Sequence, residues 1–219
     1  MKKVILPSLA LILFASITNA QITKGSIYLG GSVGAATSTF EDSNSPTQGK
    51  SSGFSINPAV GVATRNNLIV GINLNYTHGR NENFNNNQNS NRSGYGAGVF
   101  LRKYYPLSKL FYVFGESDLG YLYQNLQYLQ TAGYTYTSVN KQNSVSVSLF
   151  PGLAIHVIKS FYLEAIFSDL LRIGYYTSNS TTNYFGSTST RKQKDFLVQS
   201  SLTNGSYLNI GVRFIIPKK

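Results

Sequence analysis

Apolar and polar residues alternate one by one in eight separate segments of this chain. Successive side chains of a β-strand point to opposite faces, so each segment is typical of a strand with one apolar face and one face of small or polar residues. The pattern breaks once, at Asp169, which predicts a β-bulge near Ser168. The segments span residues 26–35, 54–63, 68–77, 94–102, 111–120, 144–155, 161–175 and 207–214.

The connections between these segments alternate in length. Three are tight turns, at 64–67, 106–109 and 157–160, and four are long and polar, at 39–52, 79–93, 124–142 and 177–203. Short periplasmic turns at one end and long extracellular loops at the other are typical of outer-membrane barrels. An even number of strands also closes without an unpaired edge, as a bilayer requires. The sequence therefore predicts an all-β, up-and-down antiparallel transmembrane β-barrel of about eight strands.

The apolar face is expected to meet lipid, because aromatic residues gather at both of its ends, as in the girdles of membrane barrels. The other face carries Gly, Ser, Asn and a few charges, which suit the inside of a narrow barrel. A water-soluble, lipocalin-like barrel would have the reverse arrangement. The predicted girdles are Tyr105, Phe111, Phe161 and Phe214 near the short turns, and Phe54, Tyr76, Tyr95, Tyr121, Tyr123 and Tyr175 near the long loops.

The N-terminus has the order of a secretory signal: two lysines, an apolar run from Val4 to Ile17, and small residues up to Ala20. We expect residues 1–20 to be a cleaved signal peptide and residues 21–219 to form one barrel domain in the outer membrane of a Gram-negative bacterium. The chain has no cysteine, which excludes disulfides and a lipoprotein anchor. After residue 20, no stretch reaches the roughly 18 apolar residues that a spanning helix needs.

The chain is basic, with a formal net charge of +11, but it carries no nucleic-acid-binding motif, so we expect no nucleic-acid partner. Basic residues outnumber acidic ones at the predicted outer end. That excess favours the phosphate-rich outer leaflet, so we expect outer-membrane lipids and lipopolysaccharide as partners. The basic residues are Lys50, Arg80, Arg92, Lys141, Arg191, Lys192 and Lys194; the acidic ones are Glu41, Asp42, Glu82 and Asp195.

Three stretches, PAVGVATRNNLIVGINLNY (58–76), GAGVFLRKYYPL (96–107) and LNIGVRFII (208–216), give the chain a family resemblance. It resembles the eight-stranded outer-membrane β-barrels of the OmpA and OmpX type, over nearly all of residues 21–219. These stretches are architectural and are shared by barrels of many roles. One departure is that the aromatic residue of the last strand, Phe214, is followed by five more residues.

Five ionisable side chains should point into the barrel at comparable depth: Arg102, Glu116, Asp118, Glu164 and Arg213. A buried charge needs a partner, so we predict an internal ion-pair network that plugs the lumen. A narrow, porin-like ion channel is the alternative. Acid/base chemistry by the neighbouring carboxylates Glu116 and Asp118 is disfavoured, because no substrate could enter a filled barrel.

The two histidines, His78 and His156, should lie at opposite ends of the barrel and cannot share a metal. A lipid A-modifying enzyme centred on His78, with Thr77 and Tyr76 nearby, is the main enzymatic alternative, but a base also needs a nucleophile and an orienting partner. We expect no enzymatic activity, no cofactor and no bound metal.

The predicted outer loops contain aromatic residues among Asn, Ser and Thr. Exposed rings beside polar groups can form binding patches, and the candidate surface-binding residues are Tyr134, Tyr136, Tyr184 and Phe185, with Phe84 and Tyr128 nearby. The sequence thus favours a monomeric barrel with a structural or adhesive role at the cell surface and, if adhesive, a ligand on a host or matrix surface.

Overall fold

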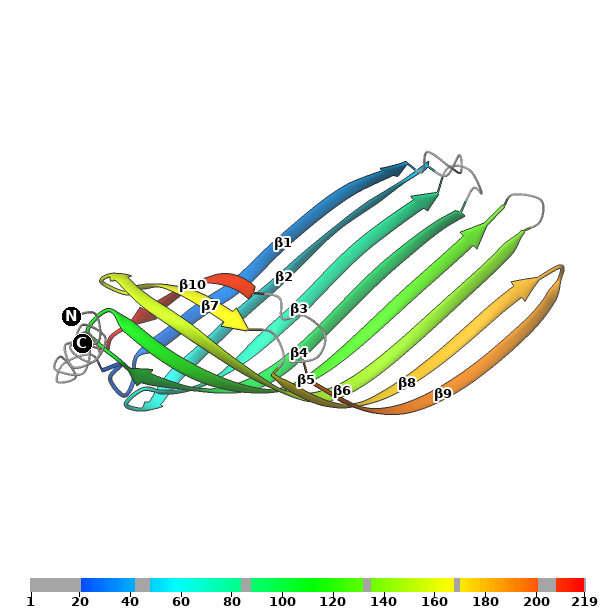
Figure 1. Ribbon diagram of the computed structural model, residues 1–219. Coiled ribbons are helices and arrows are strands. Elements are labelled where there is room, and N and C mark those ends of the chain that lie inside the picture. The colour runs from blue at the N-terminus through cyan, green and yellow to red at the C-terminus, as the bar shows by residue number, and fades with distance from the viewer. Residues whose placement is uncertain are drawn as a thin grey trace, which may run out of the picture.

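The computed structural model describes residues 21–41, 48–83, 88–131, 135–167, 170–200 and 208–218. These residues form antiparallel strands joined by turns (Figure 1). The strands are β1 (Ile27–Glu41), β2 (Gln48–Arg65), β3 (Leu68–Asn83), β4 (Gln88–Pro106), β5 (Phe111–Gln130), β6 (Tyr136–Ile158), β7 (Phe161–Phe167), β8 (Leu171–Tyr184), β9 (Ser187–Gln199) and β10 (Leu208–Ile216). The predicted signal peptide, residues 1–20, lies outside the described residues.

Eight of these strands close into a barrel. Strands β1 to β6 pair in sequence order, and the ring is completed by β6 with β7, β7 with β10, and β10 with β1. Every one of these pairings is antiparallel. The predicted all-β antiparallel barrel of about eight strands is confirmed.

The other two strands, β8 and β9, belong to an open sheet at the outer end. The long strand β6 pairs with β7 through Gly152–Ile158 and with β8 through Tyr136–Leu149. Within the described part of the chain, β1 pairs with β10 from Ile27 to Gly31, and its remaining residues pair with β2 alone. In the same part, β9 pairs with β8 alone. Among the described residues the barrel is therefore closed near the short turns and open, as a curved sheet, at the far end (Figure 1).

The prediction of a single strand over 161–175 is wrong, because this segment is divided between β7 and β8, which pair with different parts of β6. The predicted bulge near Ser168 lies outside the described residues.

The three tight turns are confirmed, but the four long polar loops are largely strands. Strand β3 runs to Asn83 and β4 starts at Gln88, and the segment 177–203 consists mostly of the outer part of β8 and the whole of β9. These outer segments carry mostly polar residues on both faces, so they lack the regular apolar alternation by which a half-buried strand is recognised. Their backbones nevertheless continue the hydrogen-bonded ladder.

The side chains sort by face as predicted. Both girdles contain outward rings that stay exposed, such as Tyr95 at 58% and Tyr105 at 56%. On β5 the outward apolar band runs from Phe111 to Tyr121, which is about 34 Å along the strand and about 26 Å in height at a tilt of about 40°. That height matches the apolar band of about 25 Å found on membrane barrels.

The buried core fills the short-turn end of the barrel. It consists mainly of inward aromatic and aliphatic side chains: Ile22, Tyr28, Ala63, Ile69, Phe100, Tyr104, Tyr112, Phe114, Ala154, Tyr162 and Ile215. Ile22 precedes β1 and is held by the β2–β3 turn, where Asn67 Oδ1 accepts a 2.8 Å hydrogen bond from the Ile22 amide. Asn67 has a φ of 61°, a left-handed conformation that asparagine tolerates in tight turns.

Candidate functional site

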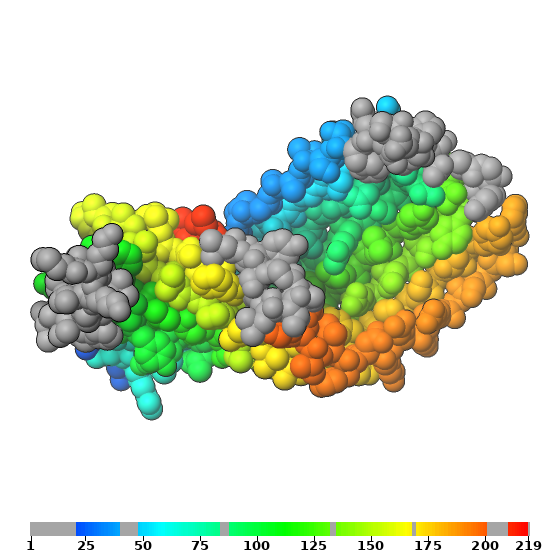
Figure 2. Space-filling model, viewed as in Figure 1, coloured from blue at the N-terminus to red at the C-terminus, as the bar shows by residue number. Residues whose placement is uncertain are grey.

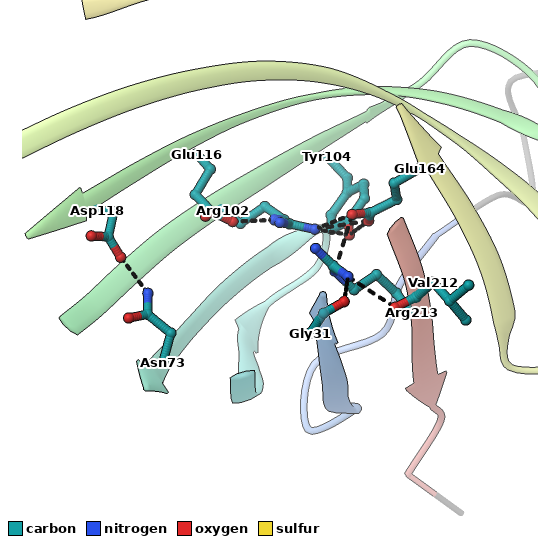
Figure 3. A network of polar contacts seen from close by, with 9 residues as sticks. All are labelled: Gly31, Asn73, Arg102, Tyr104, Glu116, Asp118, Glu164, Val212 and Arg213. Carbon is teal, nitrogen blue, oxygen red and sulfur yellow. Dashed lines mark hydrogen bonds and ion pairs between the residues drawn. The ribbon is translucent and has the colours of Figure 1, made fainter. Parts of the chain in front are cut away.

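Arg102 on β4 lies at the centre of the charged network above this core (Figure 3). Its side chain is 2% exposed. Its Nε donates to Glu116 Oε2 at 2.5 Å, and its Nη1 lies 2.7 Å from Glu164 Oε2. The Glu164 side chain is 0% exposed, so this pair is withdrawn from water completely.

Arg213 on β10 completes the group from the opposite wall. Its Nε lies 3.2 Å from Glu164 Oε2, and its Nη1 donates to the carbonyl oxygens of Gly31 and Val212 at 2.6 and 2.9 Å. A side chain at Gly30 would collide with that of Arg213, so glycine at this position makes room for the guanidinium. The structure thus brings together Arg102, Glu116, Glu164 and Arg213 from β4, β5, β7 and β10.

Aromatic side chains surround this network. The Arg102 guanidinium lies 4.4 Å from the ring centroid of Phe114 and 5.1 Å from that of Tyr28. Tyr104 Oη donates to Glu164 Oε1 at 2.6 Å and accepts from Arg102 Nη1 at 3.0 Å. Tyr104 was not predicted as a member of this network, although its position two residues after Arg102 on the same strand places it on the inner face.

Asp118, the fifth predicted member, lies one inward position farther out than Glu116 on β5. It accepts a hydrogen bond from Asn73 Nδ2, and Asn75 donates to Asn57 beside it. Figure 3 shows the Asn73 and Asp118 pair apart from the group around Arg102. The inner face therefore carries a charged layer and, beyond it, a layer of amides.

The lumen is filled on the short-turn side of the Arg102 network and hollow on the side toward the open sheet. A cavity of about 530 Å³ lies on the outer side of Arg102 and is lined by Asn57, Asn73, Asn75, Asp118 and Arg172, among others. The expectation of a barrel filled throughout is wrong for this outer part, because the inward residues there are mostly Gly, Ser and Asn, which are too small to meet at the axis. Beyond the cavity the inner surface continues as the concave face of the open sheet, between β1 and β2 on one side and β8 and β9 on the other (Figure 2).

Near the outer tip of this concave face, aromatic side chains form a row that we call the ring cluster: Tyr128, Tyr136, Tyr184 and Phe185. Their ring centroids are 5.7 Å apart for Tyr128 and Tyr136, 6.3 Å for Tyr136 and Tyr184, and 4.7 Å for Tyr184 and Phe185. A groove of about 550 Å³ beside the tyrosines is lined also by Leu126, Gln130, Ser138, Asn140 and Ser180.

The structure thus brings together three of the four candidate surface-binding residues, Tyr136, Tyr184 and Phe185. They lie on paired strands and a tight turn, whereas long loops were predicted. The fourth, Tyr134, lies outside the described residues. Phe185 lies at the β8–β9 turn with a φ of 48°, and the residue is 72% exposed. A bulky residue in this left-handed region is uncommon, because Cβ there approaches the backbone too closely.

His78 lies on the convex face of β3, away from the lumen, two residues beyond Tyr76. Its ring is 6.0 Å from that of Phe54, whereas Thr77 points to the opposite face, so the predicted grouping of His78 with Thr77 does not form. Ser93 is its cross-strand neighbour on β4. Among the described residues, no hydrogen bond joins His78 to Ser93, and no carboxylate orients the imidazole.

His156 lies at the other end of the barrel, as predicted. It stacks on Tyr162 with 4.7 Å between the ring centroids, and its Nε2 lies 2.5 Å from the Lys159 carbonyl oxygen. Within the described residues there is no group of three or more His, Cys, Asp or Glu side chains that could hold a metal ion. In the same part of the chain, no helix is long and apolar enough to cross a membrane.

No protein-family model matches the chain, and no curated protein matches it. Among solved structures, the fold is similar to the translocator domain of the autotransporter NalP from Neisseria meningitidis, with a TM-score of 0.45 and 12% sequence identity. That match covers 88% of this chain, which spans 64% of the length of the NalP domain. A second similar structure is a major outer membrane protein from Thermus thermophilus, with a TM-score of 0.40, 9% identity, and coverage of 87% of this chain and 99% of that one.

Proposed function

We propose that this protein is an integral outer-membrane barrel whose closed half is an anchor and whose open outer sheet is a binding surface at the cell surface. One observation carries the proposal. The strands bear an outward apolar band that ends in rings, and beyond those rings they continue as a polar, open sheet with the ring cluster near its tip.

The apolar band supports a membrane location. Outward Val, Leu, Ile and aromatic side chains are about half exposed on nearly every strand, from Ile27 on β1 to Ile216 on β10. A water-soluble monomer rarely exposes a contiguous apolar patch larger than a few hundred Å². In lipid the same surface is favourable, and closure of the ladder satisfies the backbone groups.

The sealed lower lumen supports an anchor instead of a channel. An ion crossing the barrel would have to pass the Arg102–Glu164 pair and then the packed rings of Tyr28, Tyr104 and Phe114, all of which are buried. Separating that ion pair inside the barrel would leave both charges without compensation, at a cost of several kcal/mol.

The ring cluster supports a binding role. Tyrosines offer flat apolar faces together with hydroxyl groups, and such residues often dominate the energy of protein interfaces. The groove beside them adds the hydroxyl and amide groups of Gln130, Ser138 and Asn140. The left-handed backbone of Phe185 costs about 1 to 2 kcal/mol, and strain of that kind is often retained at functional positions. We infer that the ligand is a polar molecule on a host or matrix surface.

A topology experiment tests this proposal. A protease site inserted after Gly186, in the β8–β9 turn, should be cut on intact cells, whereas the same site inserted after Asn66, in the β2–β3 turn, should be cut only after the cells are opened. Immunoblotting of both variants, each first checked for membrane fractionation, gives the readout. Protection of the Gly186 site or cleavage of the Asn66 site on intact cells would refute the proposed orientation.

A further inference from the structure

The basic residues of the outer end divide between the two faces of the sheet. Cross-strand register places Ser93, Asn125, Lys141, Asn179 and Lys192 in one continuous row. Alternation from the exposed outward residues Val145 and Phe196 puts Lys141, Lys192 and Lys194 on the convex face. Arg191, between Thr190 and Lys192, points to the concave face instead.

These three lysines lie on β6 and β9, the two strands that flank β8. Lys141 on β6 and Lys192 on β9 both pair with Asn179 on β8, and Lys194 pairs with the adjacent outward residue Thr177. All three lysines are exposed. The patch therefore combines three ammonium groups with the amide and hydroxyl groups of the strand between them.

Little acidic charge opposes the patch. Strands β6 and β8 contain no Asp or Glu, and β9 contains only Asp195. Asp195 alternates to the concave face, where Gln193 Nε2 donates to both of its oxygens at 3.0 Å. Elsewhere on the convex face, the Glu82 carboxylate lies 2.5 Å from Arg80 Nη2. On the convex face of β6, β8 and β9, the three lysines therefore have no acidic neighbour.

The height of the patch matches a lipid head-group region. Phe196 and Val145 are apolar and lie on the convex face. Toward the open end of the sheet, Lys194 lies two residues and Lys192 four residues from Phe196, and Lys141 lies four residues from Val145. At about 3.3 Å per residue, the ammonium groups branch from points about 7 to 13 Å beyond the apolar band, measured along the strands. In the proposed orientation, the convex face around these lysines points toward the outer leaflet of the membrane, and the concave face points away from it.

We propose that Lys141, Lys192 and Lys194 form a docking site for the phosphate groups of lipid A, the anionic lipid of the outer leaflet. This inference rests on the outer-membrane location proposed above. A lipid A molecule beside β8 would place its acyl chains against Ile173, Tyr175 and Phe196 and its phosphates among the three lysines. Attraction of this kind contributes about a factor of five per lysine at a membrane surface.

Native mass spectrometry of the purified, detergent-solubilised full chain, titrated with diphosphoryl lipid A, tests the site. The variant Lys141→Gln/Lys192→Gln/Lys194→Gln should bind about a hundredfold more weakly than the unchanged chain. The variant with all three lysines changed to arginine should bind like the unchanged chain, because the charge is kept. The matched control, Arg191→Gln/Lys24→Gln/Lys109→Gln, loses the same charge outside the patch, at Arg191 on the concave face and at Lys24 and Lys109 near the short turns. It should change affinity by less than about twofold.

Dephosphorylated lipid A should bind the unchanged chain as weakly as diphosphoryl lipid A binds the glutamine variant. The proposal is overturned if dephosphorylated and diphosphoryl lipid A bind equally well, if the control weakens binding as much as the glutamine variant, or if the unchanged chain does not bind lipid A. Binding is measured on isolated protein, whereas the Gly186 and Asn66 protease sites report location in the cell. Failure of this site and failure of the proposed function are thus distinguishable.

Discussion

Changing Arg102 to alanine should lower the free energy of unfolding of the barrel by about 3 to 5 kcal/mol. The Glu164 side chain is fully buried and contacts Arg102 through both of its oxygens, and Glu116 binds the same guanidinium. Among the described residues, removing Arg102 leaves Glu164 with Arg213, at 3.2 Å, and the hydroxyl of Tyr104. Equilibrium urea unfolding of the detergent-solubilised barrel, followed by far-UV circular dichroism, gives the measurement.

Two further variants show whether lost charge compensation is the cause. Within the network, Arg102→Ala leaves two carboxylates, Glu116 and Glu164, with Arg213 alone. Arg102→Ala/Glu164→Gln removes one of them, so that one cation again faces one anion, and it should recover part of the lost stability. Arg191→Ala, which removes an exposed arginine from β9, should change stability by less than about 0.5 kcal/mol. An unchanged unfolding midpoint for Arg102→Ala would show that the network does not stabilise the barrel.

The closed half of the fold was predictable because its two faces meet different surroundings. The outward face is apolar and the lumen face carries small or polar residues, so Val60, Val62, Ile72 and Leu74 alternate with small or polar residues. Alternation is the property that sequence reveals most directly. The same alternation identified the inward charges. It could equally have identified Tyr104, which follows Arg102 by two positions.

The open half could not be predicted in the same way. Apart from Tyr184, the residues of β8 and β9 from Thr177 to Gln193 are Ser, Thr, Asn, Gln and basic residues on both faces. The composition is therefore that of a surface loop, although the backbone is a strand. Which part of β6 pairs with β7 and which with β8 depends on contacts far apart in the chain. The side chains of Tyr136 and Tyr184 meet only because of that pairing.

Changing Tyr136, Tyr184 and Phe185 together to serine should reduce cell attachment to background while the barrel still inserts. These rings are neighbours in the row near the outer tip, so one variant removes three of the four rings of the cluster, two of which line the groove. Central aromatic residues of an interface often contribute about 2 kcal/mol or more each, so the affinity should fall by well over a hundredfold. Attachment of cells expressing each variant to epithelial monolayers and to immobilised matrix extract gives the readout.

The matched control changes the opposite face of the same tip. Leu129 and Val139 lie on the convex side of β5 and β6 at the height of the ring cluster, so Leu129→Ser/Val139→Ser removes apolar surface without touching the groove and should leave attachment unchanged. If both variants attach as well as the unchanged chain, the ring cluster is not the binding surface.

The enzymatic alternative makes a separate prediction at His78. A general base supplies about a hundredfold or more in rate, so His78→Ala would change the acylation of lipid A extracted from cells if His78 were catalytic. We expect the mass spectrum of lipid A to be the same with and without this change, because among the described residues His78 contacts the ring of Phe54 and is oriented by no carboxylate. Loss of attachment in the serine variant together with unchanged lipid A in His78→Ala would favour a binding protein over an enzyme, whereas altered lipid A would make the convex face near Ser93 a catalytic site.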